Sequence, residues 1–138
     1  GGTAWQSAIG AGNTAVDLAT AALALAANGS IFAGSDNGLF QTKNPGAQIP
    51  VWTELAIIPG PSRSANAIAA HPTDAQTLWV GTPSLIARST SGGSRNSFST
   101  QKVTARWVTG FAFRPGTPDT LYAATAGAGL LKTITAGE

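Results

Sequence analysis

One pattern occurs three times in this sequence, and no other feature limits the possible folds so strongly. Its copies read SIFAGSDNGLFQTKNPGAQIPVW over residues 30–52, TLWVGTPSLIARSTSGGSRNSF over residues 77–98 and TLYAATAGAGLLKTITAGE over residues 120–138. The aromatic residues Phe32, Trp79 and Tyr122 are equivalent and lie 47 and 43 residues apart. A repeat of this length corresponds to a small structural unit that buries its apolar face only by stacking on its neighbours.

Each copy contains the signals of four short strands separated by Gly, Asn and Ser turns. The predicted inner strands contain Leu23, Ile68 and Phe111; the second strands are Ile31–Gly34, Leu78–Gly81 and Leu121–Ala124; the third are Leu39–Thr42, Leu85–Ser89 and Gly129–Thr133; the outer ones are led by Trp52, Phe98 and Trp5. Four strands at this period predict an all-β fold, a β-propeller of about three four-stranded blades whose ring is incomplete in one chain.

The first inner strand has two interpretations. The run from Ala15 to Ala27 has high helix propensity, and Gly29 follows it as a potential helix stop. Leu23 and Leu25, however, alternate with alanines, and Asn28-Gly29 is also a preferred hairpin turn. Strand-like segments occupy the same place in the other two copies, and we therefore predict a strand at Ala22–Ala27.

The outer strand of the third copy is predicted to come from the other end of the chain. Counting on from residue 138 to residue 1 puts Trp5 at notional position 143, which is 45 beyond Phe98. The blades then span roughly residues 15–60, 61–106 and 107–138, the last completed by residues 1–10. Because propellers typically have four to eight blades, we expect a second copy of this chain, the rest of a longer chain or other protein subunits to complete the ring.

Composition argues against several classes of function. The chain has no Cys, one His and a net charge of only +2, so we expect no disulfide framework, no metal site and no nucleic-acid-binding surface. The apolar run at residues 16–27 is shorter than the roughly 20 residues of a membrane span. Nucleotide-binding, zinc-binding and nucleophile-elbow motifs do not occur in the sequence. We therefore expect no cofactor and no catalytic residue.

The end of each copy resembles the BNR or Asp-box repeat, S/T-x-D-x-G-x-x-W. The counterparts are Thr42, Asn44 and Gly46 with Trp52; Ser89, Ser91 and Gly93 with Phe98; and Thr133, Thr135 and Gly137 with Trp5. Similar repeats occur in photosystem II assembly-factor-like proteins, sortilin-type receptors, sialidases and xyloglucanases, so the resemblance implies the fold without fixing an activity. We expect structural turns, in which a polar side chain accepts backbone N–H groups, Gly permits a positive φ and the aromatic ring packs beneath.

Other polar residues have ordinary structural interpretations. His71 ends an inner strand, where we favour a turn residue over a site residue. Asp74 and Asp119 occupy equivalent positions and are predicted to form turns. Glycoside hydrolysis needs two carboxylates close together, and Asp17 is the one acid that we consider for such a pair. Tyr122 is predicted to be a core residue, which argues against a sialidase-like nucleophile.

These observations predict a non-catalytic binding or scaffold module. Its expected partners are proteins, either copies of this chain or other subunits, with carbohydrate bound through loops such as residues 91–97 as a second ligand class. The alternatives are a fragment of a secreted glycoside hydrolase of the Asp-box propeller fold and an accessory subunit of a larger complex. We expect an extracellular or periplasmic location.

Overall fold

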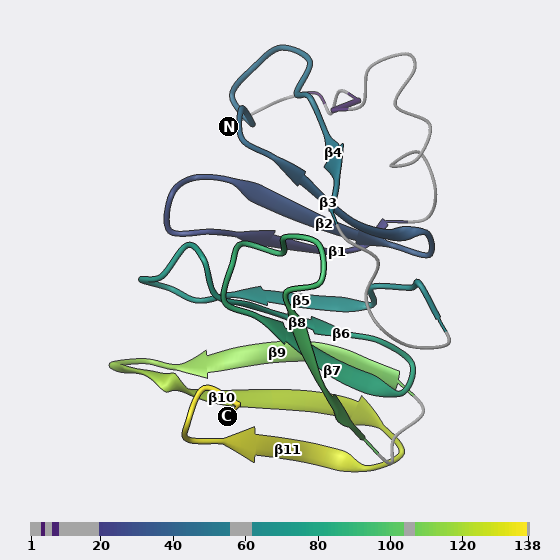
Figure 1. The fold of residues 1–138 in the computed structure, drawn as a ribbon, viewed down its shortest axis with the longest axis vertical. Helices are drawn as coiled ribbons and strands as arrows, with labels where there is room; N and C mark the ends of the chain where they lie inside the picture. The colour runs from purple at the N-terminus through teal and green to yellow at the C-terminus, as the bar shows by residue number, and fades with distance from the viewer. Residues whose placement is uncertain (1–3, 5–6, 9–19, 56–61, 104–106, 138) are drawn as a thin grey trace.

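The computed structural model describes residues 4, 7–8, 20–55, 62–103 and 107–137, which form three antiparallel sheets (Figure 1). The sheet orders are β1-β2-β3-β4, β5-β6-β7-β8 and β11-β10-β9. The strands are β1 Thr20–Leu25, β2 Ile31–Ser35, β3 Gly38–Thr42, β4 Thr53–Glu54, β5 Ala67–Ala70, β6 Leu78–Gly81, β7 Leu85–Ser89, β8 Phe98–Lys102, β9 Trp107–Arg114, β10 Thr117–Ala126 and β11 Gly129–Thr133. Each sheet is a meander of strands adjacent in sequence, and the predicted all-β fold is confirmed.

The first inner strand is a strand and not a helix. β1 begins two residues earlier than predicted and pairs with β2, with Leu23 opposite Ala33. The Ala26 N–H donates to the Ser30 carbonyl oxygen at 2.9 Å, and Gly29 has a φ of +83°. Asn28-Gly29 therefore forms the hairpin turn, because pairing with β2 outweighs the local helix propensity.

The hairpin between β9 and β10 differs from the prediction. Asp119, predicted to form a turn, lies inside β10. The chain turns earlier, where Gly116 has a φ of +75° and Thr117 pairs with Arg114. A left-handed glycine allows this tight turn, so β9 and β10 extend past the point where the second copy turns at Asp74.

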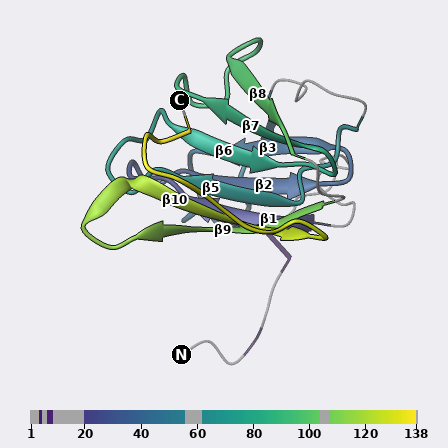
Figure 2. The same cartoon turned by 90° about the horizontal axis from the view of Figure 1, so that it is seen from below.

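The sheets stack face to face in chain order, with the inner strands β1, β5 and β9 side by side (Figures 1 and 2). One apolar core lies between the first and second sheets and contains Phe32, Leu39, Ile68, Leu78, Val80 and Ala87. A second lies between the second and third sheets and contains Ala69, Trp79, Leu121 and Ala136, with Ile86, Phe111 and Phe113 packed against it. The aromatic positions of the repeat thus supply burial between sheets, as the sequence predicts.

Every sheet has a forward face, toward the next sheet along the chain, and a backward face, toward the preceding one. Phe32 and Leu39 belong to the forward face of the first sheet, and Trp79 and Ile86 to that of the second. The forward face of the third sheet, which carries Tyr122 and Leu130, has no sheet against it in the described part of the chain. Tyr122 is consequently half-buried instead of core.

Candidate functional site

The turn after β3 is held by Asn44. The Thr42 hydroxyl donates to the Asn44 Oδ1 at 2.9 Å, and the Val51 N–H donates to the same oxygen at 3.1 Å. These bonds fix the loop that carries Trp52 to the start of β4. Gly46 does not have a positive φ, so the backbone role expected for it is not used here.

The turn after β7 is organised by a hydroxyl. Ser89 is fully buried, and its Oγ accepts the N–H groups of Ser91 and Gly93 at 3.2 and 3.1 Å. The same Oγ lies 2.6 Å from the Ser97 hydroxyl, one residue before Phe98. The first residue of the motif, Ser89, is thus the polar side chain that accepts the backbone N–H groups of this turn.

The turn after β11 repeats this geometry and also contacts the second sheet. The Thr133 Oγ1 accepts the N–H groups of Thr135 and Gly137 at 3.3 and 3.0 Å. The Trp79 Nε1–H donates to the Ala136 carbonyl oxygen at 3.1 Å in a buried position. This contact was not predicted, since its partners lie in different copies and meet only when the sheets stack.

Most of residues 1–10, which were predicted to supply the outer strand of the third copy, lie outside the described residues. The carbonyl oxygen of Ala8 accepts a hydrogen bond from the Trp52 Nε1–H at 3.0 Å. Ala8 therefore contacts the residue that precedes β4 in the first sheet. Trp5 itself lies outside the described residues.

His71 is part of a turn after β5. Its ring is buried, and its Nδ1 accepts the backbone N–H groups of Thr73 and Asp74 at 3.3 and 3.0 Å. The ring also lies 5.9 Å from Phe113 and 6.1 Å from Trp79, centroid to centroid. These contacts agree with the turn interpretation of His71.

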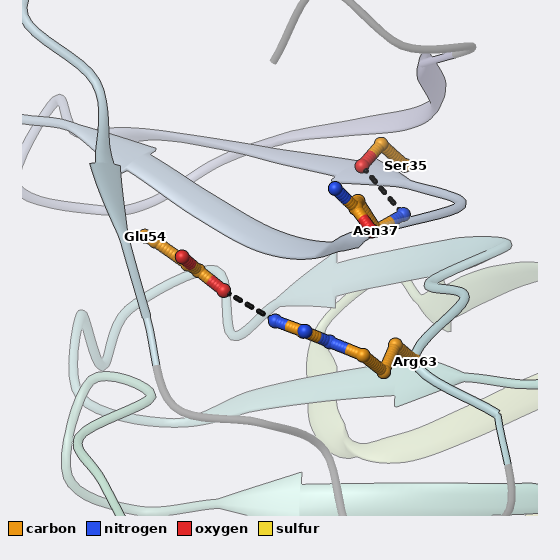
Figure 3. Close-up of polar contacts among 4 residues, drawn as sticks. All are labelled: Ser35, Asn37, Glu54 and Arg63. Atoms are coloured by element: carbon orange, nitrogen blue, oxygen red, sulfur yellow. Dashed lines mark hydrogen bonds and ion pairs between the residues drawn. The ribbon is translucent and has the colours of Figure 1, made fainter. Parts of the chain in front are cut away.

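Polar contacts near the first sheet involve Glu54 and the β2–β3 turn. The Arg63 guanidinium donates to Glu54 at 2.6 Å between β4 and the segment before β5, while the Asn37 N–H donates to the Ser35 hydroxyl in the β2–β3 turn (Figure 3). Across the described ranges there is no group of three or more metal-ligating side chains, and no helix there is long and apolar enough to cross a membrane. Asp17 lies outside those ranges.

A groove of about 260 Å³ opens between the second and third sheets, beside β11. Its apolar floor includes Trp79, Ile86, Phe111, Leu121, Ala123 and Leu131. Its described lining also includes Arg88, Lys102 and Lys132, and the Lys132 ammonium lies 5.8 Å from the centroid of the Tyr122 ring. In the structure the Arg88 guanidinium lies 6.0 Å from the centroid of the Trp79 ring. The apolar floor suits an apolar side chain.

A shallower apolar hollow of about 200 Å³ lies on the forward face of the third sheet. It is lined by Gly110, Phe111, Ala112, Tyr122, Ala124 and Leu130. Neither of these concave surfaces was predicted from the sequence, although Tyr122 had been identified as the counterpart of Trp79.

Solved structures share this architecture at low sequence identity. A structure described as the WD40 repeats of RRP9 aligns with a TM-score of 0.68 and 20% identity, covering 87% of this chain and 36% of that one. The structure of U3-55K gives 0.67 and 21%, covering 87% and 37%, and a luciferin-regenerating enzyme gives 0.61 and 18%, covering 78% and 38%. No family model and no curated protein matches the sequence.

The chain spans little more than a third of the length of these structures. At such identities the likeness shows the fold alone. WD40 repeats form propeller blades of four-stranded sheets, and the stacked meanders of this chain have the same arrangement. The three sheets are therefore blades of a β-propeller whose ring is incomplete in this chain.

Proposed function

We propose that this chain is a non-catalytic protein-binding or scaffold module that binds through the two outer faces of its stack, and that a second copy completes the ring. The observation that carries the proposal is that these faces expose residues whose repeat counterparts are buried between sheets. Leu130 is 67% exposed on the forward face of the third sheet, whereas its counterpart Leu39 is fully buried. Leu23 is 66% exposed on the backward face of the first sheet, whereas Ile68 is buried.

The two internal interfaces share a backbone hydrogen bond. This repetition supports the proposal that a further sheet can pack on each end of the stack in the same way. The Ala65 N–H donates to the Ser35 carbonyl oxygen at 2.9 Å between the first and second sheets, and the Val108 N–H donates to the Thr82 carbonyl oxygen at 3.2 Å between the second and third. Thr125 is the counterpart of Ser35 and Thr82 in the third copy. Burial of the exposed leucines would contribute roughly 1.5–3 kcal/mol for each side chain fully covered.

Two copies related by a twofold axis would form two equivalent contacts, each between the forward face of one copy and the backward face of the other. Six blades lie within the usual range for a closed ring. Closure would also cover apolar sheet faces that are otherwise open to nonspecific association. The scaffold would then present its connecting loops on a rigid ring.

Native mass tests the proposal. Sedimentation or light scattering of the wild-type protein is expected to give twice the chain mass of 13.8 kDa. Leu130→Asp and Leu23→Asp should each be monomeric with unchanged circular dichroism, because each places a charge in both contacts of the ring. Ile134→Asp, at a similarly exposed leucine-sized residue in a turn, is the matched control and should remain a dimer.

Mixing the two variants sharpens the test. A pair of Leu130→Asp and Leu23→Asp copies has one contact with both charges and one contact with neither. The mixture should therefore associate more strongly than either variant alone. A wild-type monomer at high concentration would overturn self-assembly and leave blades from another chain as the partners, and a glycan array on the wild-type protein would test the carbohydrate alternative.

A further inference from the structure

We propose that the N-terminal segment around Ala8 is an autoinhibitory strap, which covers part of the backward face of the first sheet and must leave before a second copy can dock there. The inference rests on the proposed ring closure and adds its regulation, because the chain keeps its own contact surface partly closed. The part concerned is the outer part of the face, which contains Ala33, Phe40 and Trp52.

The outer part of this face is buried although no sheet in the described part of the chain packs on it. Ala33 and Phe40 are each 1% exposed, and Trp52 packs against them. On the inner strand β1, by contrast, Leu23 and Leu25 are 66% and 69% exposed. The face is therefore open along β1 and closed at its outer part.

The second sheet shows what covers the same place at an internal interface. The counterparts there are Val80, Ala87 and Phe98. They belong to or pack against the core between the first and second sheets, so the forward face of another sheet covers them. In the first sheet the described contact at this place is the hydrogen bond from the Trp52 Nε1–H to the Ala8 carbonyl oxygen at 3.0 Å. Ala8 thus lies where a neighbouring sheet would pack.

The internal interface also identifies the residue of a second copy that needs this place. Leu39 lies in the core against which Phe98 packs, and its Cδ2 is 3.7 Å from the position that a Cβ on Gly93 would take. Leu130 is the counterpart of Leu39, and Trp52 is the counterpart of Phe98. Leu130 of a second copy would therefore approach Trp52 at the place that the strap occupies.

Competition of this kind lowers the apparent affinity between two copies without any change in their interface. Only chains whose strap has left the face can associate, so the dissociation constant is raised by the inverse of the fraction of such chains. The hydrogen bond between Trp52 and Ala8 is exposed, and a bond of this type makes a modest net contribution. We therefore expect the strap to change the dissociation constant by a few-fold instead of blocking association.

Trp52→Phe releases the strap in the full chain. It removes the Nε1–H donor and keeps an aromatic ring, which is also what the second copy has at Phe98. We expect the dissociation constant of the dimer to fall by about threefold, and sedimentation equilibrium over a dilution series measures it. Thr53→Ala, at the exposed neighbour in β4, is the control and should leave the constant unchanged.

A spin label attached through Ala8→Cys reports the position of the strap. The chain has no Cys, so the label has a single attachment site. In the Leu130→Asp background, which is expected to be monomeric and leaves the first sheet unchanged, the label should broaden the Phe40 amide and Trp52 indole signals. With the native Leu130, at concentrations that form the dimer, this broadening should be relieved.

The outcomes separate the strap from ring closure. Broadening that persists in the dimer, or a dimer with the same dissociation constant for wild type and Trp52→Phe, overturns the strap and leaves ring closure intact. Absence of broadening in the monomer also overturns the strap, as does weaker association of Trp52→Phe, because the indole would then belong to the contact between copies. If wild type and Trp52→Phe both stay monomeric at high concentration, ring closure fails and the strap fails with it.

Discussion

Asp74 shows how a single side chain shapes the connection between β5 and β6. Its Oδ2 accepts the Thr77 hydroxyl at 2.6 Å, and its Oδ1 accepts the Gln76 N–H at 2.9 Å. The pKa of the Asp74 carboxyl lies below its ordinary value of 3.8. The hydrogen bond from Thr77 is the main cause of this lowering, and the hydrogen bond from Gln76 is the second. Both donors favour the charged carboxylate over the neutral acid.

The lowered pKa of Asp74 makes part of the stability dependent on pH. Because the folded-state pKa lies below 3.8, the carboxylate stabilises the fold above that pH, and this contribution is lost as the pH falls through the folded value. Asp74→Asn should therefore lower the urea midpoint at neutral pH, and its difference from the wild type should shrink in strong acid. Asp119→Asn corrects for net charge, and a difference for Asp74→Asn that is constant with pH would contradict the assignment.

At the scale of elements, the turn after β7 depends on one buried hydroxyl. Ser89→Ala removes the acceptor of the Ser91 and Gly93 N–H groups. Since the Gly93 amide is buried there, we expect a loss of about 1–3 kcal/mol in the free energy of unfolding. Urea denaturation measures it, with the exposed neighbour Thr90→Ala as the control. Equal stability of Ser89→Ala and Thr90→Ala would show that the hydroxyl is not needed.

The strands were largely predictable because each copy constrains the others. The strands at Leu78–Gly81, Leu85–Ser89 and Gly129–Thr133 agree with β6, β7 and β11, since alternation within a copy and position across copies point to the same ranges. The prediction that Asp119 forms a turn was wrong, because Gly116 has a left-handed conformation and provides an earlier turn. The hydrogen bond from Trp79 to Ala136 and the groove beside β11 depend on how the sheets stack, which local pattern does not specify.

On the scale of the whole molecule, the outer forward face lacks a glycine that both internal forward faces have. Gly34 and Gly81 lie where the next sheet approaches closely: a Cβ there would be 2.4 Å from the Ala65 carbonyl oxygen or 2.5 Å from the Val108 Cγ1. The third copy has Ala124 at this position. Its methyl group would hold a further sheet slightly away from the spacing of the internal interfaces.

Ala124→Gly should consequently tighten the association of two copies. Removal of the methyl group relieves an overpacked contact of the kind that costs roughly 1–3 kcal/mol, and we expect the dissociation constant of the dimer to fall by about tenfold. Sedimentation equilibrium over a dilution series measures the constant. Ala128→Gly, in the exposed turn between β10 and β11, is the control for the greater backbone freedom of glycine. If Ala124→Gly weakens the dimer or leaves it unchanged, the outer faces do not meet in the manner of the internal ones, and the association must use another surface.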